Sequence, residues 1–224
     1  MKRSKITILL AIVLGMTFHS CLDLEPQDQL GGKNMWTSVN DYKQFANTFY
    51  SWTRDFSSVV YDGTHSDKRS DLITYQSYNE FSRGINSIPS SDANYTDNYK
   101  HIRRTNLLLQ NAEAYAKPED IKQYIGEAYF FRAYSYFDLL QLYGDVIITK
   151  KPLDITDPEM KVKRNDRSEV VDLIIDDLNH AVENLPAFKE LTTEEEGRIS
   201  KEGAQAFLSR VALYEGTWQK SRNG

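Results

Sequence analysis

The segment from Tyr124 to Tyr143, YIGEAYFFRAYSYFDLLQLY, most strongly constrains what this chain can fold into. Apolar and aromatic side chains fall on nearly every face of the helix that the segment predicts. Such a helix is stable only when other elements surround it. Gly144 follows directly, and glycine commonly ends an α-helix because it readily adopts the left-handed backbone conformation. We therefore predict a central core helix that ends at Gly144.

Four other segments have the apolar periodicity of amphipathic helices and are candidates to surround this core. They are DYKQFANTFYSWTRDF from Asp41, NYKHIRRTNLLLQNAEAYA from Asn98, RSEVVDLIIDDLNHAVENLP from Arg167, and SKEGAQAFLSRVALYEGTW from Ser200. The first is expected to start at an N-cap near Thr37, Ser38 or Asn40, and the third at Ser168. Short connections without a fixed repeat period predict a mainly α fold of TPR-like helical hairpins.

The N-terminus has the pattern of an export signal. Lys2, Arg3 and Lys5 precede an apolar run, Ile6 to Phe18, that is too short to span a bilayer. No later segment is apolar for long enough to cross one. We predict a signal peptide over residues 1–20, an extended tether over 21–39 and a helical domain over 40–224.

Cys21, which is the only cysteine, follows the apolar run and Ser20. This arrangement resembles a bacterial lipoprotein signal, in which the cysteine thiol is acylated and becomes the first residue of the mature chain. The alternative is an unpaired thiol in an oxidising compartment, which exported proteins tend to avoid. We expect Cys21 to be the site of lipidation and to attach the chain to a membrane.

Several classes of function are disfavoured by the sequence. The formal net charge of −5 does not suit a nucleic-acid binder, which carries clustered basic residues. His65, His101 and His180 are far apart and have no ligand partners at metal-binding spacing. No motif of a hydrolase, a nucleotide-binding loop or a dinucleotide fold is present. The acidic run 194–196 is better explained as a solvated loop than as a glycosidase pair. We therefore expect no enzyme activity, no cofactor and no metal.

Arg132 lies within the apolar core segment and needs a separate explanation. A guanidinium there must find a carboxylate or carbonyl groups, because an unpaired buried charge is very costly. We interpret Arg132 as architectural.

Five stretches in this order together resemble the SusD/RagB family of nutrient-uptake outer-membrane lipoproteins. They are CLDLEP at Cys21, YKHIRRTNLLLQNAE at Tyr99, GEAYFFRAYSYFDLLQLYGDV at Gly126, RSEVVDLIIDDLNHAVENLP at Arg167 and GRISKEGAQAFLSRVALYEGTW at Gly197. The sequence GDVIIT departs from the family, which usually has a Pro after Gly-Asp-Val. Family members are also longer, so the resemblance implies that residues 40–224 are a truncated N-terminal helical domain. The last helix would then leave an unpartnered apolar face, formed by Phe207, Leu208, Val211 and Leu213.

The resemblance implies a protein that is lipid-anchored in the outer membrane and faces the cell exterior. It would bind oligosaccharides and deliver them to a TonB-dependent SusC-like transporter. Asp23 and Glu25 fit the kind of signal that sends such lipoproteins outward. A peptide-binding RagB-type lipoprotein and a TPR-like scaffold lipoprotein without a small ligand remain alternatives, and an anchored hydrolase is the least favoured.

The long irregular segment before the second helix is where we expect ligand binding. Helical periodicity is lost between Ser57 and Asn94, and exposed loops often carry binding residues. Aromatic faces suit the apolar face of a pyranose, and planar polar groups suit its hydroxyls. The candidates are Arg69, Asp71, Tyr75, Tyr78 and Arg83. For each of them, ordinary loop packing is the competing explanation.

Overall fold

The computed structural model describes residues 35–54, 80, 83–154 and 156–223. Contacts divide the chain into Met1–Met35 and Trp36–Gly224, and the helical body described below belongs to the second unit. Its α-helices are α2 (Val39–Asn47), α3 (Ala93–Glu113), α4 (Lys122–Tyr143), α5 (Arg167–Asn184) and α6 (Lys201–Asn223). Short 3-10 helices lie between them: η1 (Thr48–Trp52), η4 (Pro118–Ile121), η5 (Pro158–Lys161), η6 (Phe188–Glu190) and η7 (Thr193–Glu195). Within the described ranges there is no strand, and one isolated antiparallel bridge joins Val146 to Asn165.

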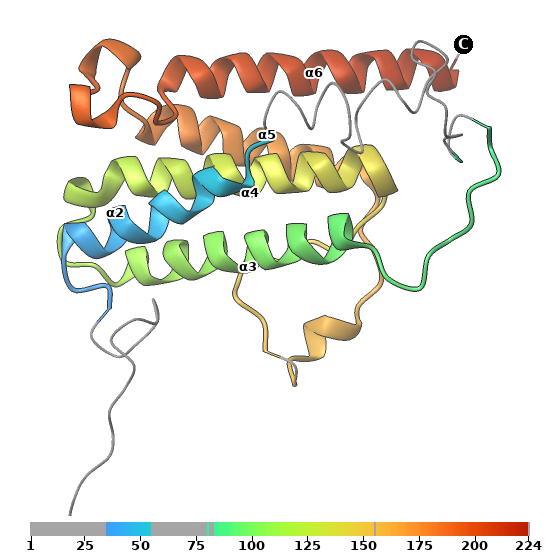
Figure 1. Cartoon of the computed structure of the whole chain (residues 1–224), viewed down its shortest axis with the longest axis horizontal. Coiled ribbons are helices and arrows are strands. Elements are labelled where there is room, and N and C mark those ends of the chain that lie inside the picture. Colours follow the sequence, from blue (N-terminus) through green and yellow to red (C-terminus); the bar gives the residue numbers. More distant parts are fainter. Residues whose placement is uncertain (1–34, 55–79, 81–82, 155, 224) are drawn as a thin grey trace, which may run out of the picture. The chain divides into compact units, whose positions relative to one another are not determined.

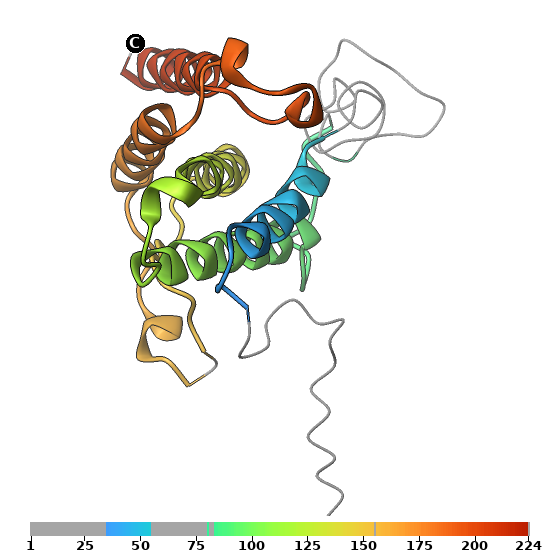
Figure 2. The same ribbon diagram turned by 90° about the vertical axis from the view of Figure 1, so that its left-hand side faces the viewer.

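The predicted core helix is α4, and it lies between the other helices (Figures 1 and 2). It packs against α3 on one side and α5 on another, and α6 packs on α5. Phe131, Tyr136 and Leu139 are fully buried on different faces of α4, as a helix that is apolar all round requires. Gly144 ends the helix with a positive φ of 70°, which favours glycine. The prediction of a central helix ending at Gly144 is confirmed.

The start of α2 agrees with the sequence, whereas the start of α5 does not. Ser38 caps α2, because its hydroxyl accepts from the Asp41 amide while the Asp41 carboxylate accepts from the Ser38 amide. The cap of α5 is Asp166, so the prediction of Ser168 is wrong by two residues. The carboxylate of Glu169 reaches back to the Asp166 amide at 2.9 Å, which fixes the first turn at that point.

The helix α6 buries more of its apolar surface than the sequence analysis expected. The ring of Phe207 contacts Phe130, Tyr134 and Phe137 of α4 at centroid distances of 5.4–5.7 Å. Val211, one turn further along, is fully buried. The expected unpartnered face is therefore wrong for these two residues, because the stripe they form points at α4 and α5. Leu213 lies on another face and is 73% exposed.

Candidate functional site

Most of the residues predicted to carry function lie outside the described residues. These are Cys21, Arg69, Asp71, Tyr75 and Tyr78, which remain predictions. Arg83 is described and is exposed, in a turn that precedes the extended approach to α3. The structure therefore neither brings these candidates together nor separates them.

The described residues form a pocket of about 460 Å³ beside α3, which we call the α3 pocket. One wall is a single face of α3, and the opposite wall is the chain that follows α4. The lining residues are Tyr95, Thr96, Tyr99, Lys100 and Arg103 from α3, Ile147, Thr149, Lys151 and Leu153 from the extended segment, and Glu159 from η5. The volume lies within the range of small-ligand sites, about 300–1,000 Å³.

The sequence carries a signal for each wall, although not for their pairing. The α3 residues recur at helical spacing, and the residues of the second wall alternate, as on one side of an extended chain. No pattern in the sequence indicates that the two segments meet to form a pocket. In Figure 1, the segment that carries η5 projects beside α3.

Side chains of α3 hold the extended segment in place. The Tyr99 hydroxyl donates to the Ile147 carbonyl at 2.8 Å. The Asn106 amide donates to the carbonyls of Thr149 and Lys151 at 3.0 and 3.2 Å. Backbone groups that would pair with a strand are thus satisfied by side chains instead. The second wall of the pocket is consequently fixed relative to α3.

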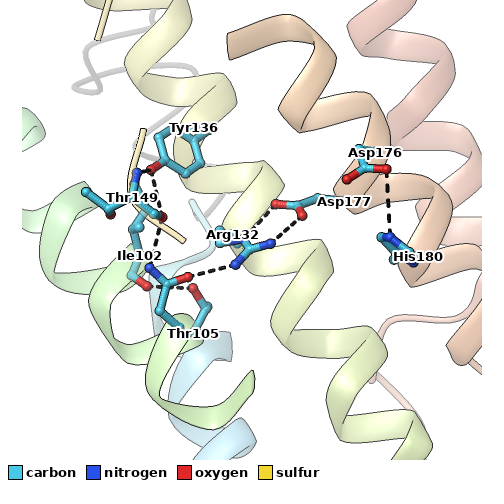
Figure 3. Close-up of polar contacts among 9 residues, drawn as sticks. Ile102, Thr105, Arg132, Tyr136, Thr149, Asp176, Asp177 and His180 are labelled. Atoms are coloured by element: carbon cyan, nitrogen blue, oxygen red, sulfur yellow. Dashed lines mark hydrogen bonds and ion pairs between the residues drawn. The ribbon is translucent and has the colours of Figure 1, made fainter. Parts of the chain in front are cut away.

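A buried ion pair continues this network into the core (Figure 3). The guanidinium of Arg132 donates to both carboxylate oxygens of Asp177 at 2.8 and 2.6 Å, and to the Asn106 side-chain oxygen at 2.8 Å. The two charged side chains are 6% and 0% exposed. Burial raises the pKa of Asp177, whereas the hydrogen bonds from Arg132 favour its ionised form. Arg132 thereby joins α3, α4 and α5, as an architectural role requires.

A second buried pair joins α4 to the loop before α6. Arg198 donates to both oxygens of Glu127 at 2.7 Å, and the Glu127 side chain is 0% exposed. Arg198 also contacts the Asn47 side-chain oxygen at the end of α2. Glu127 was not among the residues predicted from the sequence. Its signal was a carboxylate within a segment that is apolar on nearly every face.

Further features of the described part of the chain concern metal ligands and a half-buried histidine. No group of three or more His, Cys, Asp or Glu side chains there is arranged to hold a metal ion. His101 stacks on Trp52 with ring centroids 4.1 Å apart, and burial lowers the pKa of His101 to about 4. Among the described helices, none combines the length and apolarity that a membrane crossing requires.

Comparison with known proteins identifies the class to which this fold belongs. Residues 22–213 match a family described as starch-binding and associating with the outer membrane. The chain belongs to the SusD-like family. This membership confirms the resemblance drawn from the sequence, and the SusD-like neighbours agree with a helical, TPR-like fold.

The matches to individual relatives extend over nearly all of this chain but over less than half of each relative. The chain is 28% identical to SusD-like protein P38 of Formosa agariphila, over 95% of its own length and 42% of the relative. SusD-like protein P2 of the same organism is also 28% identical, over 99% of this chain and 45% of the relative. The chain thus spans less than half the length of these relatives.

Solved structures show the same fold. A SusD-like protein from Bacteroides fragilis matches with a TM-score of 0.69 and 27% identity, over 87% of this chain and 38% of that one. A laminarin-binding SusD-like protein matches with a TM-score of 0.55 and 31% identity, over 62% of this chain and 30% of that one.

Proposed function

We propose that this chain is the glycan-capturing part of an outer-membrane lipoprotein that passes oligosaccharides to a TonB-dependent SusC-like transporter. The observation that carries the proposal is the match of residues 22–213 to a starch-binding, outer-membrane-associated family. A laminarin-binding relative with the same fold supports a carbohydrate ligand. The α3 pocket, which is lined by tyrosine, aliphatic and charged side chains, also fits the binding of a small ligand.

Membrane attachment is proposed to depend on Cys21. Acylation of its thiol would anchor the protein, with residues 21–39 as a tether and 40–224 as the SusD-like helical domain. Stable anchoring requires more than one acyl chain. Asp23 and Glu25 are proposed as the signal that directs the anchored protein to the cell exterior. Cys21→Ser should abolish incorporation of a clickable palmitate analogue and release the chain from the membrane fraction. Equal incorporation by the variant would refute the anchor.

Ligand capture is proposed to involve the loop that contains Arg69, Asp71, Tyr75, Tyr78 and Arg83. Aromatic rings and planar polar side chains are the groups that a sugar ring and its hydroxyls bind. These residues would act with the rest of the helical domain rather than as an enzyme site.

Calorimetry on the full chain, purified in detergent, tests capture. The probes are laminarihexaose, maltohexaose and a tryptic digest of casein. We expect saturable binding of at least one oligosaccharide, and weaker binding by Tyr75→Ala and Tyr78→Ala. The control is Phe188→Ala, which removes an aromatic ring that is 66% exposed on η6 and should bind as the wild type does. Binding of the peptides alone would favour the RagB-type alternative. Binding of neither class would refute capture and favour a scaffold.

The proposed delivery of oligosaccharides to a transporter is tested by identifying the proteins that co-purify with the lipoprotein. Affinity purification from the native outer membrane should recover a large TonB-dependent β-barrel in amounts comparable to the lipoprotein. Recovery of the lipoprotein without such a barrel would refute the transporter partnership. Glycan capture would still be decided by the calorimetry.

A further inference from the structure

We propose that the α3 pocket binds an uncharged sugar unit, as a saccharide site additional to the loop at 69–83. This inference rests on the proposed function and assigns a ligand class to a pocket that neither the family match nor the relatives describe. It follows from the walls of the pocket, the charges around it and the way its second wall is held.

The walls offer apolar faces of fixed orientation. The rings of Tyr95 and Tyr99 have centroids 4.8 Å apart at 49°, and Tyr143 meets Tyr95 edge-on at 5.2 Å. The hydroxyl of Tyr99 is tied to the Ile147 carbonyl. Both rings are therefore positioned before a ligand arrives, and Ile147 and Leu153 extend the apolar surface opposite them. Aromatic and aliphatic walls with few polar groups are typical of ligand sites.

The charges of the pocket compensate one another. Lys100 pairs with Asp97 at 2.7 Å, and Lys151 pairs with Glu159 at 2.7 Å. Arg103 lies 3.9 Å from Asp154. The lining holds three cations and one carboxylate, and Asp97 and Asp154 just outside it offset two of the cations, which reduces the electrostatic preference for an anionic or a cationic ligand. These pairs are largely exposed, and such pairs contribute only about 0–1 kcal/mol to stability.

The same side chains supply both kinds of hydrogen-bonding partner that hydroxyl groups require. Lysine and arginine donate only, and ionised carboxylates accept only, whereas a hydroxyl does both. Lys100 and Lys151 stand beside carboxylates, so neighbouring hydroxyls of one sugar ring meet donors and acceptors in turn. A neutral pyranose combines these hydroxyls with an apolar face, which matches the two tyrosine rings.

The pocket is also rigid on the side that has no regular secondary structure. Asn106 holds the carbonyls of Thr149 and Lys151, and Arg132 in turn holds Asn106 from the core. The wall is thus connected to the buried pair between α4 and α5. A preorganised wall lowers the entropic cost of binding.

The test fills the pocket in the full chain. Thr96→Trp places an indole at an exposed lining position, and Gln110→Trp places one at an exposed position of the same helix that does not line the pocket. Calorimetry in detergent uses laminarihexaose and maltohexaose as neutral probes, and a galacturonic acid hexamer as the anionic probe. We expect Thr96→Trp to remove one equivalent of bound neutral sugar or to weaken binding by about tenfold or more. Gln110→Trp should match the wild type.

A second variant keeps the test decisive if Thr96→Trp does not fold. Lys100→Met removes a rim donor, and Lys122→Met is its control, because each lysine pairs with an acid three residues earlier on the chain. Lys100→Met should weaken neutral-sugar binding by about two- to tenfold, the range for one lost hydrogen bond. Lys122→Met should have no effect.

The outcomes separate this inference from the proposed function. Wild-type binding of a neutral sugar with the same isotherm for Thr96→Trp, Gln110→Trp and Lys100→Met would overturn the pocket assignment alone. Tighter binding of the galacturonic acid hexamer, abolished by Thr96→Trp, would overturn the neutral class. If the wild type binds neither laminarihexaose nor maltohexaose, glycan capture as a whole is refuted, and this inference with it.

Discussion

Replacing Arg132 by Met tests whether the buried ion pair holds α3, α4 and α5 together. The methionine keeps most of the aliphatic volume of the side chain but removes the guanidinium. Asp177, which is 0% exposed, would lose both of its hydrogen bonds from Arg132, and Asn106 would lose one. The carboxylate would then be buried without a positive partner.

The expected loss of stability follows from these contacts. Hydrogen bonds that involve a charged group contribute about 1.5–3 kcal/mol each, so the two bonds to Asp177 account for about 3–6 kcal/mol. Removing one partner of a buried pair typically costs about 3–5 kcal/mol. We therefore expect Arg132→Met to lower the free energy of unfolding by about 3–5 kcal/mol. For a chain of this size that corresponds to a melting temperature lower by about 6–20 °C.

The pH dependence of the variant is a sharper test than its stability alone. Without Arg132, burial is left to act on Asp177 and raises the pKa of its carboxyl above the unfolded value of about 4. The folded state then binds more protons than the unfolded state above that pH. The variant should therefore lose stability as the pH rises from about 4 towards neutrality, relative to the wild type.

Urea unfolding followed by far-UV circular dichroism measures these effects at pH 7 and pH 4.5. The double variant Arg132→Met with Asp177→Leu removes both charges and should be less destabilised than Arg132→Met alone. A single variant that loses less than about 1 kcal/mol, or a double variant that is no better than the single one, would refute the reasoning.

Three further predictions concern other described residues. Gly126→Ala should destabilise by about 1–3 kcal/mol, because the added carbon would lie 2.9 Å from a Leu185 side-chain atom, whereas Gly216→Ala, which meets nothing within 4 Å, should stabilise by up to about 1 kcal/mol. Glu127→Gln should cost about 2 kcal/mol in urea unfolding, because Arg198 loses a charged acceptor. Because burial lowers the pKa of His101 to about 4, stability should fall as the pH drops from about 6.5 to about 4, and less steeply in His101→Gln.

Each of these has a result that would contradict it. Changes of the same sign in Gly126→Ala and Gly216→Ala would remove the argument from close helix packing. A Glu127→Gln variant as stable as the wild type would show that the pair with Arg198 contributes nothing net. An unchanged slope of stability against pH in His101→Gln would assign that slope to other groups.

Some elements of the fold could be predicted from local sequence, and the structure confirms their positions. The position of α4 in the core could be predicted because Tyr124 to Tyr143 is apolar on nearly every face, and such a helix is stable only when other elements surround it. The sequence placed the cap of α2 near Thr37, Ser38 or Asn40, and the structure selects Ser38. Both signals lie within a single helix, so no knowledge of packing was needed.

Other features depended on contacts between distant segments. Asp166 and Ser168 are both suitable helix caps, and the structure decides for Asp166, next to the bridge that Asn165 makes with Val146. The face of α6 that is buried was also undetermined, since Phe207 and Leu213 lie on different faces of one helix. The buried face is the one that carries Phe207, because Phe207 contacts Phe130 and Phe137 of α4.

The sequence by itself determined the helical class, the central helix, the need of Arg132 for a partner and the resemblance to SusD-like proteins. The tertiary structure alone decided that this partner is Asp177, 45 residues away, and that the chain after α4 lies against α3 to form a pocket. The physical reason is that periodicity and capping report on the nearest turns of the chain. Ion pairs and pockets depend on how separate helices pack.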